Sequence, residues 1–378
     1  MRVLMIVPTF RPNIGGVESY VDDLCSFLVR RGNAVSVLTY QPLTTRARGP
    51  AYEKEGGLEI RRISWFGMNL FHALEPYPAL EFLYITPYLF LHAFFFMLRH
   101  GRSIDVIHAQ GLNAAFIARA LSAWFGKRAV ASTCAVYGFR PRSLFARAAR
   151  RILAGFARVL ALGPVSAKEL EAIGVPREKI RLYNLWVDQR AYAPLDKATA
   201  KARIGCPQAF LVLFVGRFIP IKGVDVLMEA ARRADTGIVF YFIGDSGPLL
   251  EHVRRAAAQH GNIRLIEGVR GRDLIPYYQA ADLQVVPSLY EEAFGKVIIE
   301  ALSCGTPVIG ARRGAIPGII DPGVGRVVEP TADNIIEAIE DLRRRPEALA
   351  GLTGRCRGHA VEHYGEKNAE TIAEAYAS

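Results

Sequence analysis

Cysteine is scarce in this 378-residue chain, and the few cysteines follow no recognisable pattern. There are five, an odd number, at widely separated positions: Cys25, Cys134, Cys206, Cys304 and Cys356. No pair has the short spacing of metal ligands, so no structural zinc site is expected. The scatter also argues against a disulfide framework and is typical of proteins from a reducing compartment.

Long uninterrupted apolar runs are missing as well. The run Val3–Val7 ends at Pro8, which is too short for the apolar region of a signal peptide, so we expect a buried strand there. A longer run, Phe82–Leu98, holds seventeen uncharged residues but is interrupted by Pro87. It falls short of a spanning helix, and we expect it to be buried in a domain or seated shallowly at a membrane interface.

Negative charge is sparse in the first half of the chain. Residues 1–190 carry 25 Lys and Arg against 13 Asp and Glu, a net charge of +12, whereas residues 191–378 carry 22 against 23. No helix-turn-helix, zinc-finger or RNA-binding aromatic motif accompanies this excess, so no nucleic acid partner is expected. An anionic membrane surface or an anionic acceptor is the better match.

One segment of this basic half, Arg142–Leu160, has the pattern of an amphipathic helix. Its apolar residues recur at helical spacing, while most of its arginines fall elsewhere on the helical wheel. Two interpretations stay open, a helix that binds a membrane surface and an ordinary surface helix with its apolar stripe on the core.

Apolar runs of strand length alternate with helical patterns along the chain, as in parallel sheets covered by crossover helices. The predicted strands are Arg2–Val7, Ala34–Thr39, Val106–His108, Ala129–Thr133, Val159–Leu162, Phe210–Gly216, Val239–Gly244, Ile263–Glu267, Leu283–Pro287 and Pro307–Gly310. Periodicity is lost near residues 190–200. We predict an α/β protein with two Rossmann-like domains, residues 1–190 and 191–360, whose parallel sheets face each other across a cleft.

The segment Pro287–Ala301 carries the strongest functional signal. Glu292 lies in a loop and Glu300, eight residues later, lies on the helix that follows. Between them, the residues Phe294, Gly295, Lys296 and Val297 form a helix start, where free backbone N–H groups and the helix dipole favour an anion. Two acidic acceptors beside an anion cradle suit a ligand that is both phosphorylated and rich in hydroxyls, such as a nucleotide sugar.

Two further turns follow predicted strands. The turn Gly216–Gly223 supplies Arg217 and Lys222 at the carboxyl edge of a sheet, where α/β proteins bind ligands. Its guanidinium and ammonium groups suit phosphate oxygens. The pair Gly15 and Gly16 precedes a helical pattern and leaves room for a ligand. That loop lacks the third glycine and distal acid of a dinucleotide fingerprint, so NAD is not expected.

With these motifs the whole chain resembles retaining glycosyltransferase family four, of GT-B architecture, and Glu292–Glu300 matches its Glu-x7-Glu signature. The resemblance implies that Glu292 lies beside the donor sugar and that Glu300 holds the ribose. It implies that Arg217 and Lys222 hold the donor diphosphate, and that the backbone around Val269 contacts the base. It also implies that the Gly15 loop reaches the donor phosphate or the acceptor, and that the last helix, residues 361–378, packs back on the first domain.

The chain departs from the family pattern at four places. Cys134 follows Ser132-Thr133 where the family has a histidine near the sugar, and His108 is followed by Ala109-Gln110 where a second histidine is common. We therefore take His108 and Cys134 as candidates near the sugar or the acceptor. The other departures are Pro317-Gly318-Ile319 and the turn Asn184–Asp188.

The sequence contains no Asp-x-Asp triplet, which glycosyltransferases of the other major fold use to bind a divalent ion, so we expect no metal and no other cofactor. We predict a retaining glycosyltransferase that uses a UDP-type or GDP-type sugar and a lipid-linked or glycan acceptor in cell-envelope glycan or glycolipid biosynthesis. It is expected in the cytoplasm, peripheral on the inner face of the plasma membrane. Two alternatives are a catalytically impaired nucleotide-sugar-binding protein and a GT-B nucleotide-sugar epimerase.

Overall fold

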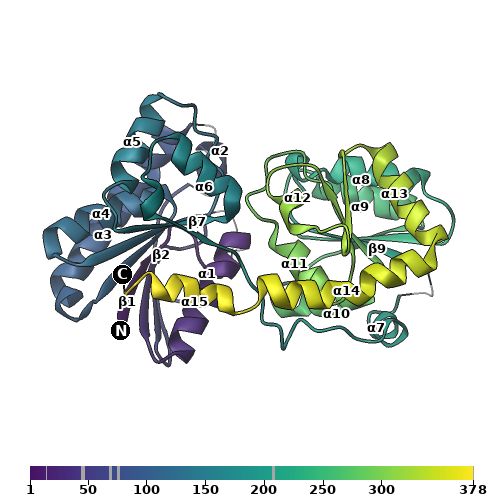
Figure 1. The fold of residues 1–378 in the computed structure, drawn as a ribbon, viewed down its shortest axis with the longest axis horizontal. Helices are drawn as coiled ribbons and strands as arrows, with labels where there is room; N and C mark the ends of the chain where they lie inside the picture. Colours follow the sequence, from purple (N-terminus) through teal and green to yellow (C-terminus); the bar gives the residue numbers. More distant parts are fainter. Residues whose placement is uncertain (14, 44–46, 68–69, 75–76, 207–208, 378) are drawn as a thin grey trace. The chain divides into compact units, whose positions relative to one another are not determined.

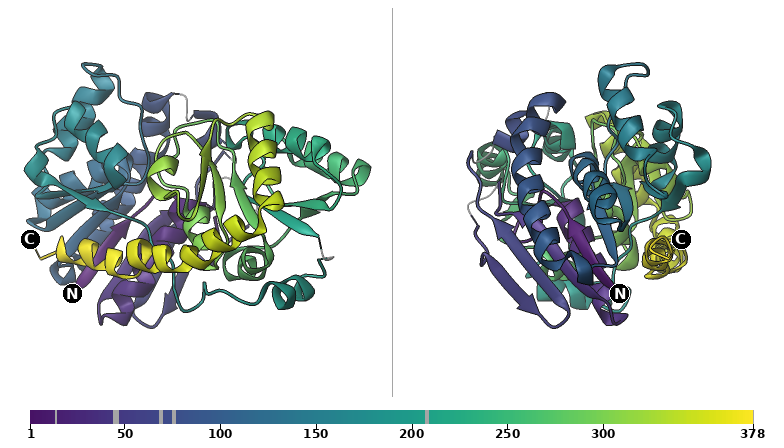
Figure 2. Two further views of the ribbon diagram at one scale, coloured as in Figure 1. Left: turned by 45° about the vertical axis from the view of Figure 1, so that its right-hand side comes forward. Right: turned by 90° about the vertical axis from the view of Figure 1, so that its left-hand side faces the viewer.

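The computed structural model describes residues 1–13, 15–43, 47–67, 70–74, 77–206 and 209–377. Contacts divide the chain into two compact units (Figures 1 and 2). Unit 1 comprises Met1–Leu185 and the C-terminal segment that begins at Lys367, and unit 2 comprises Trp186–Glu366. The sequence predicted the boundaries between the two domains after residues 190 and 360. Each unit has its own sheet and its own apolar core.

Among the described residues, unit 1 contains an eight-stranded sheet. Its strands are β1 (Arg2–Ile6), β2 (Ala34–Tyr40), β3 (Tyr52–Glu55), β4 (Leu58–Ile63), β5 (Val106–Gln110), β6 (Arg128–Thr133), β7 (Arg158–Leu162) and β8 (Ile180–Tyr183). They lie in the order β3-β4-β2-β1-β5-β6-β7-β8, and every pair is parallel except β3 with β4. The central strands β1 and β5 are almost fully buried, which accounts for their continuous apolar sequence.

The helices of unit 1 are α1 (Gly16–Arg30), α2 (Leu70–Leu74), α3 (Pro78–His100), α4 (Leu112–Phe125), α5 (Leu144–Leu153), α6 (Gly163–Ala172) and α15 (Lys367–Glu374), with short 3₁₀ turns η1 (Gly101–Ser103) and η2 (Arg177–Lys179). Helices α3 to α6 contribute to one apolar cluster. Helix α4 contacts both α3 and α5, whereas α15 contacts α1 and β8 (Figure 1). Unit 1 is therefore a layered α/β unit.

In the described part of unit 2, six strands form a parallel sheet. They are β9 (Phe210–Val215), β10 (Ile238–Ile243), β11 (Ile263–Ile266), β12 (Leu283–Val286), β13 (Val308–Ala311) and β14 (Gly325–Val328). The order is β11-β10-β9-β12-β13-β14, so the chain builds outward from β9 in one direction and then returns to build outward from β12 in the other. The crevice between β9 and β12 is a topological switch point, the usual ligand position in such sheets.

Helices on the two faces of this sheet complete unit 2. They are α7 (Lys197–Arg203), α8 (Val224–Arg233), α9 (Leu250–Gln259), α10 (Ile275–Ala280), α11 (Lys296–Ser303), α12 (Ile316–Ile319), α13 (Ala332–Arg344) and α14 (Pro346–Tyr364), with 3₁₀ turns η3 (Pro220–Lys222) and η4 (Gly271–Leu274). The prediction of an α/β fold with two Rossmann-like parallel sheets is confirmed.

Several local predictions were wrong. The last helix is two helices, because α14 ends at Tyr364 and α15 begins at Lys367, with extended backbone at Gly365 between them; Ser378, predicted in the same helix, lies outside the described residues. The helix expected over 142–160 is only α5, since the chain turns after Leu153 and β7 begins at Arg158.

Four observed strands were missed. The edge hairpin of β3 and β4 is rich in charged residues and shows no continuous apolar run. Strands β8 and β14, the outermost strands at one edge of each sheet, are short and only partly buried. An edge strand needs less apolar sequence than a central one because one side of it faces solvent.

Candidate active site

The candidate site of unit 2 is built from loops at the carboxyl ends of β9 and β12, which are neighbours in the sheet. The loop after β9 contacts the loop after β12 through the Leu289 N–H, which donates to the Ile221 carbonyl at 2.7 Å. Gly223 has a positive φ of 70°, and a Cβ there would lie 2.0 Å from the Pro287 carbonyl oxygen. A residue with a side chain would therefore push the two loops apart.

This approach brings Lys222 to Glu292. The Lys222 ammonium donates to the buried Glu292 carboxylate, which also accepts from the Ser288 hydroxyl at 2.9 Å and the Tyr290 hydroxyl at 2.6 Å. Lys222 Nζ lies 3.0 Å from the Tyr290 hydroxyl and about 5.0 Å from the centre of its ring. Four side chains thus form one charged, hydrogen-bonded cluster at the switch point.

The main chain of Glu292 is fixed from a third side. The loop after β13 packs against it, with the Ala315 N–H donating to the Glu292 carbonyl at 2.8 Å. The Gly314 N–H donates to the Glu291 carboxylate at 2.6 Å. Gly314 has a φ of 53°, and a Cβ there would lie 2.3 Å from the Glu292 carbonyl oxygen. Glu292 is therefore held by its side chain and by its backbone.

Helix α11 begins where the sequence predicted an anion cradle. Gly295 is its N-cap residue in the left-handed region (φ 82°), Phe294 is buried, and Lys296 and Val297 form the first turn. The first N–H groups of a helix have no partner within it, so this end can receive a phosphate.

Glu300 lies about one turn further along α11 and is buried. It accepts from the Tyr278 hydroxyl at 2.7 Å, and Lys296 Nζ lies 4.0 Å from its other oxygen. Burial and the neighbouring Glu300 raise the pKa of Tyr278 well above its usual value, so the phenol keeps the proton that it donates. Glu300 is thereby oriented before any ligand arrives.

The other predicted donor residues lie on loops of the same sheet. Arg217 follows β9 after Gly216, and Val269 follows β11 in a loop where Gly268 has a φ of 77°. Next to Val269, the Arg270 guanidinium is bonded to Asp245. The structure thus brings Lys222 into direct contact with Glu292 and Lys296 close to Glu300, and it places Arg217 and Val269 on separate loops.

Sequence reasoning missed the residues that support the two glutamates. Ser288 and Tyr290 stand inside the Glu292 motif and could have been proposed from their position in it. Tyr278 and Gly314 lie on other elements, α10 and the loop after β13, and no local pattern marks them. Their roles come from the packing of neighbouring strands.

A metal site is not evident in the part of the chain that the structure describes. No group of three or more His, Cys, Asp or Glu side chains there is arranged to hold a metal ion. Independence from a metal stays a prediction.

In unit 1 the switch point lies between β1 and β5, and Gly15 and Gly16 stand beside it at the start of α1. A Cβ on Gly15 would lie 2.3 Å from a carboxylate oxygen of Glu18, which accepts from the Asn13 amide at 3.0 Å. A side chain at position 15 would therefore displace the Glu18 carboxylate from its contact with Asn13. The approach of a ligand to this loop stays a prediction.

His108 is fully buried in the middle of β5, with both ring nitrogens occupied. Nδ1 lies 2.7 Å from the Tyr376 hydroxyl and Nε2 lies 2.7 Å from the Ser132 hydroxyl. Burial lowers the pKa of His108 to about 3, so the ring is neutral. His108 thus ties the C-terminal segment to the sheet, and direct contact with an acceptor would require this bond network to open.

Cys134 follows β6 in the same region. Its thiol donates to the Gln110 side-chain carbonyl at 3.2 Å and lies 3.9 Å from the Tyr183 hydroxyl. Burial raises the pKa of Cys134 to about 12, so the sulfur is a neutral thiol at physiological pH. A nucleophilic role is not supported. The prediction that it lies near the acceptor stays a prediction.

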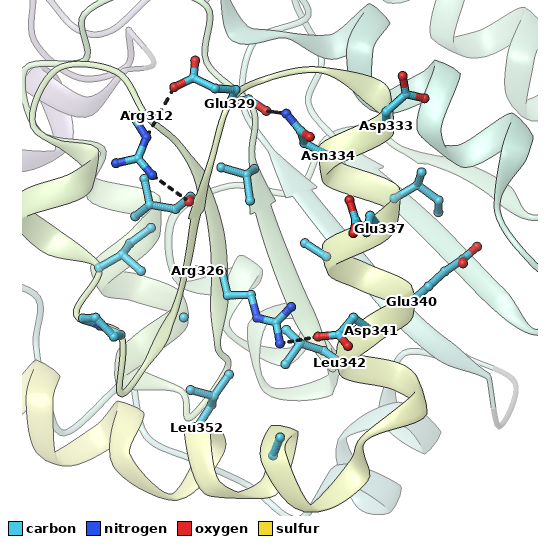
Figure 3. A pocket seen from close by; sticks show the side chains of 18 of the residues that line it. Arg312, Arg326, Glu329, Asp333, Asn334, Glu337, Glu340, Asp341, Leu342 and Leu352 are labelled. Atoms are coloured by element: carbon cyan, nitrogen blue, oxygen red, sulfur yellow. Dashed lines mark hydrogen bonds and ion pairs between the residues drawn. The ribbon is translucent and has the colours of Figure 1, made fainter.

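A separate open cavity of about 1620 Å³ lies among β14, α13 and α14 (Figure 3). None of the predicted site residues lines it. Most of its guanidinium groups are paired with carboxylates, for example Arg312 with Glu329 and Arg326 with Asp341. Because these charges neutralise one another, the cavity is a poor match for a diphosphate.

Two protein families match the chain in succession. Residues 15–186 match the family described as Glycosyl transferase 4-like domain, and residues 197–353 match the family described as Glycosyl transferases group 1. The first match lies almost entirely in unit 1, and the second lies within unit 2.

Curated relatives carry one recurring name. A D-inositol 3-phosphate glycosyltransferase of Saccharomonospora viridis is 34% identical over 216 residues, which are 53% of this chain and 50% of that protein. One from Thermobifida fusca is 28% identical over 347 residues, 83% of this chain and 76% of the relative. The chain thus spans about half the length of the first of these relatives.

Solved structures match over the full length. Sucrose-phosphate synthase from Thermosynechococcus elongatus superposes with a TM-score of 0.81 at 21% identity, over 100% of this chain and 98% of that one. Anabaena HepE in complex with UDP-glucose gives 0.79 at 18% identity, over 100% and 99%. At such identities the likeness establishes the fold. Since both halves of the chain also match their families in order, the chain belongs to glycosyltransferase family four, with the GT-B fold.

Proposed function

We propose that the protein is a retaining, metal-independent glycosyltransferase that moves a sugar from a nucleoside-diphosphate sugar to a lipid-linked or membrane-surface acceptor. The observation that carries the proposal is the cluster of Lys222, Tyr290 and Glu292 at the switch point of unit 2, beside the start of α11. The cluster combines a cation for phosphate, a carboxylate for hydroxyls and a helix start for an anion.

The donor is proposed to be a UDP-sugar, with GDP-sugars as the alternative. Support comes from HepE, whose structures contain UDP, glucose or UDP-glucose. In unit 2 the diphosphate would lie between Lys222, Arg217 and the first turn of α11, and Glu300 would accept from the ribose hydroxyls. Tyr278, which fixes Glu300, would keep that carboxylate aimed at the ribose.

Without a donor, the charges of Lys222 and Glu292 neutralise each other. A bound diphosphate would draw the Lys222 ammonium toward its oxygens, and Glu292 would then be free to accept hydrogen bonds from hydroxyls of the sugar. Tyr290 touches both partners, so its hydroxyl can follow the change without leaving a buried oxygen unsatisfied.

In the proposed reaction, the bond between the sugar's anomeric carbon and the diphosphate oxygen breaks, and the acceptor oxygen bonds to that carbon on the same face. The acceptor's proton passes to the departing phosphate oxygen. Because the acceptor enters on the face from which the diphosphate departs, the configuration is retained. Lys222, Arg217 and the helix start would stabilise the charge of the leaving group. These positive groups are the reason to propose independence from a metal ion.

The acceptor and location are proposed from the charge of unit 1. Five arginines around α5 have guanidinium groups that make no hydrogen bond or ion pair with other described residues: Arg140, Arg142, Arg147, Arg150 and Arg151. In unit 2 many arginines are paired, for example Arg233 with Asp333. Uncompensated arginines suit an anionic surface, which favours a peripheral position at the cytoplasmic face of the plasma membrane and a role in envelope glycan or glycolipid synthesis.

Nucleoside diphosphate release from a panel of nucleotide sugars, with and without membrane lipid extract, tests the proposal. We expect release that depends on the acceptor, survives EDTA and is lost in Lys222→Ala and Glu292→Ala. Binding without release would favour the impaired binding protein. Conversion of the sugar without release would favour an epimerase. NMR of the product's anomeric proton tests retention.

A further inference from the structure

Helix α3 is apolar on two opposite faces. One face, which includes Ile85, Leu89, Ala93 and Met97, is buried in the core of unit 1. The opposite face points outward and is also apolar, with exposed fractions of 66% for Leu83, 50% for Leu91, 63% for Phe95 and 58% for Leu98. A surface helix of a water-soluble domain normally has polar residues on its outer face, so this stripe indicates a partner.

Helix α4 packs beside α3 and extends the apolar surface (Figure 1). Trp124, 64% exposed, contacts the rings of Phe90 and Phe94 edge-on at centroid distances of 5.8 Å and 5.2 Å. Phe116, 40% exposed, contacts Phe82 in the same way. Aromatic rings from two helices therefore form one continuous patch rather than isolated exposed residues.

The patch fits a bilayer surface better than a bilayer crossing. Residues 78–103 are long and apolar enough to span a membrane, with a mean hydropathy of 1.4 in their most apolar part. However, the inner face of α3 packs against the core that also holds β1 and β5, so the helix cannot leave unit 1 without exposing that core. A helix that lies in the plane of the membrane surface keeps its inner face in the core of unit 1 and places its outer face against lipid.

The charges around the patch identify the kind of surface. Arg99, Arg102 and Lys127 stand at the C-terminal ends of α3 and α4, and their side chains have no acidic partner among the described residues. Helix α5, which contacts α4, adds Arg147, Arg150 and Arg151, which line a shallow hollow of about 520 Å³ with Ala154 and Gly155. An apolar patch bordered by unpaired cations complements anionic headgroups above acyl chains.

We propose that the outer surface of α3 and α4 inserts into an anionic phospholipid bilayer, with Leu91, Phe95 and Trp124 among the acyl chains, while the arginines of α5 bind headgroup phosphates. This rests on the membrane-surface acceptor proposed above and adds the residues and the depth of the contact. The proposed occupant is lipid rather than a second copy of the chain. In a symmetric pair, the cations that border the patch of one copy would repel those that border the patch of the other.

Trp124 provides a direct probe of insertion. The sequence has three tryptophans; Trp186 is buried, and Trp65 packs against Tyr40 and Tyr88 inside unit 1. With vesicles of phosphatidylcholine and phosphatidylglycerol whose acyl chains carry bromine, we expect the fluorescence of the full chain to be quenched. Trp124→Phe should still bind the vesicles and lose most of the quenching.

Vesicle flotation then separates the apolar and the electrostatic contributions. Leu91→Gln and Phe95→Gln should each weaken binding about tenfold, since each removes a large apolar side chain from the acyl region. Val361→Gln on α14, where the valine is 46% exposed, is the matched control and should bind like the wild type. Arg150→Gln and Arg151→Gln should each weaken binding about fivefold, and only when phosphatidylglycerol is present.

Three results would overturn the proposal. One is vesicle binding that shows no quenching and is unaffected by Phe95→Gln, which would mean that electrostatic attraction alone holds the protein on the membrane. Another is a dimer in solution that Phe95→Gln dissociates without lipid, which would assign the patch to a second copy. The third is no binding to anionic vesicles at low salt. Thermal stabilisation by UDP, measured on the same variants, tests the donor site separately, so failure of either hypothesis is visible without the other.

Discussion

The contact between Lys222 and Glu292 gives the sharpest prediction about the donor site. Lys222→Met removes the ammonium and keeps most of the side chain's length, and Glu292→Gln removes the negative charge and keeps the shape. Each single variant leaves one charge without its partner in a partly buried position, whereas the double variant leaves none. We expect stability and activity to respond differently to the three variants.

The structure sets the expected size of these effects. The Glu292 side chain is 8% exposed and that of Lys222 is 23% exposed. Breaking a fully buried pair costs about 3–5 kcal/mol, and the access of water to Lys222 reduces this to about 2 kcal/mol for each single variant. The double variant should recover about 1–2 kcal/mol relative to the sum of the singles. Each single should lower kcat by about a hundredfold or more, and the double should recover none of it.

Chemical denaturation and nucleoside diphosphate release measure the two quantities. Lys201 and Asp282 form a matched control pair in the same unit, at 2.6 Å and with side chains 17% and 16% exposed. Lys201→Met should cost a similar free energy of unfolding and leave kcat within about twofold. If the double variant of Lys222 and Glu292 regained wild-type turnover, the pair would be structural and the assignment would fail.

Three further predictions follow from particular contacts. Gly314→Ala should displace the Glu292 backbone and abolish transfer, while Gly318→Ala, whose Cβ would meet nothing within 4 Å, should be tolerated. Gln284 is fully buried on β12 with neither amide atom bonded, so Gln284→Met should raise the free energy of unfolding by about 1–3 kcal/mol. Burial lowers the pKa of His108 to about 3, so below about pH 6.5 the unfolded chain gains a proton that the folded chain refuses. That difference should cost about 2 kcal/mol of stability by about pH 5 and vanish in His108→Gln.

Each of these has an outcome that contradicts it. Full activity in Gly314→Ala would mean that the Glu292 backbone is not fixed by that loop. A loss of stability in Gln284→Met would mean that the amide has a bonded partner such as a buried water. An unchanged dependence of stability on pH in His108→Gln would mean that the ring is not held neutral by burial.

The central strands could be predicted from sequence because burial on both faces imposes a continuous apolar run. Strands β1 and β9 begin where the sequence placed them and end within one residue. The β3 and β4 hairpin could not, since at the edge of a sheet its charged residues face solvent. The break at Gly365 was hidden because helical periodicity resumes directly beyond it in α15.

The candidate site also combines features that the sequence predicts with features that it does not. Lys222 and Glu292 follow predicted strands and Glu300 lies on a predicted helix, so local pattern was enough to choose them. That Lys222 binds Glu292 depends on β9 lying beside β12, a pairing of segments seventy residues apart in sequence. Tyr278 and Gly314 act through the same kind of non-local packing, which no local pattern records. His108 was chosen for its chemistry, and its contact with Tyr376 in the C-terminal segment could not be predicted from local pattern.

The central claim is that unit 2 holds a nucleoside-diphosphate sugar through Lys222, Glu292 and Glu300 and delivers its sugar without a metal. The most direct measurement is acceptor-dependent nucleoside diphosphate release in EDTA, by the wild type and by Glu292→Gln. The account predicts release by the wild type and a loss of about a hundredfold or more in the variant. Equal release by both proteins, or release only after a divalent metal is added, would contradict it.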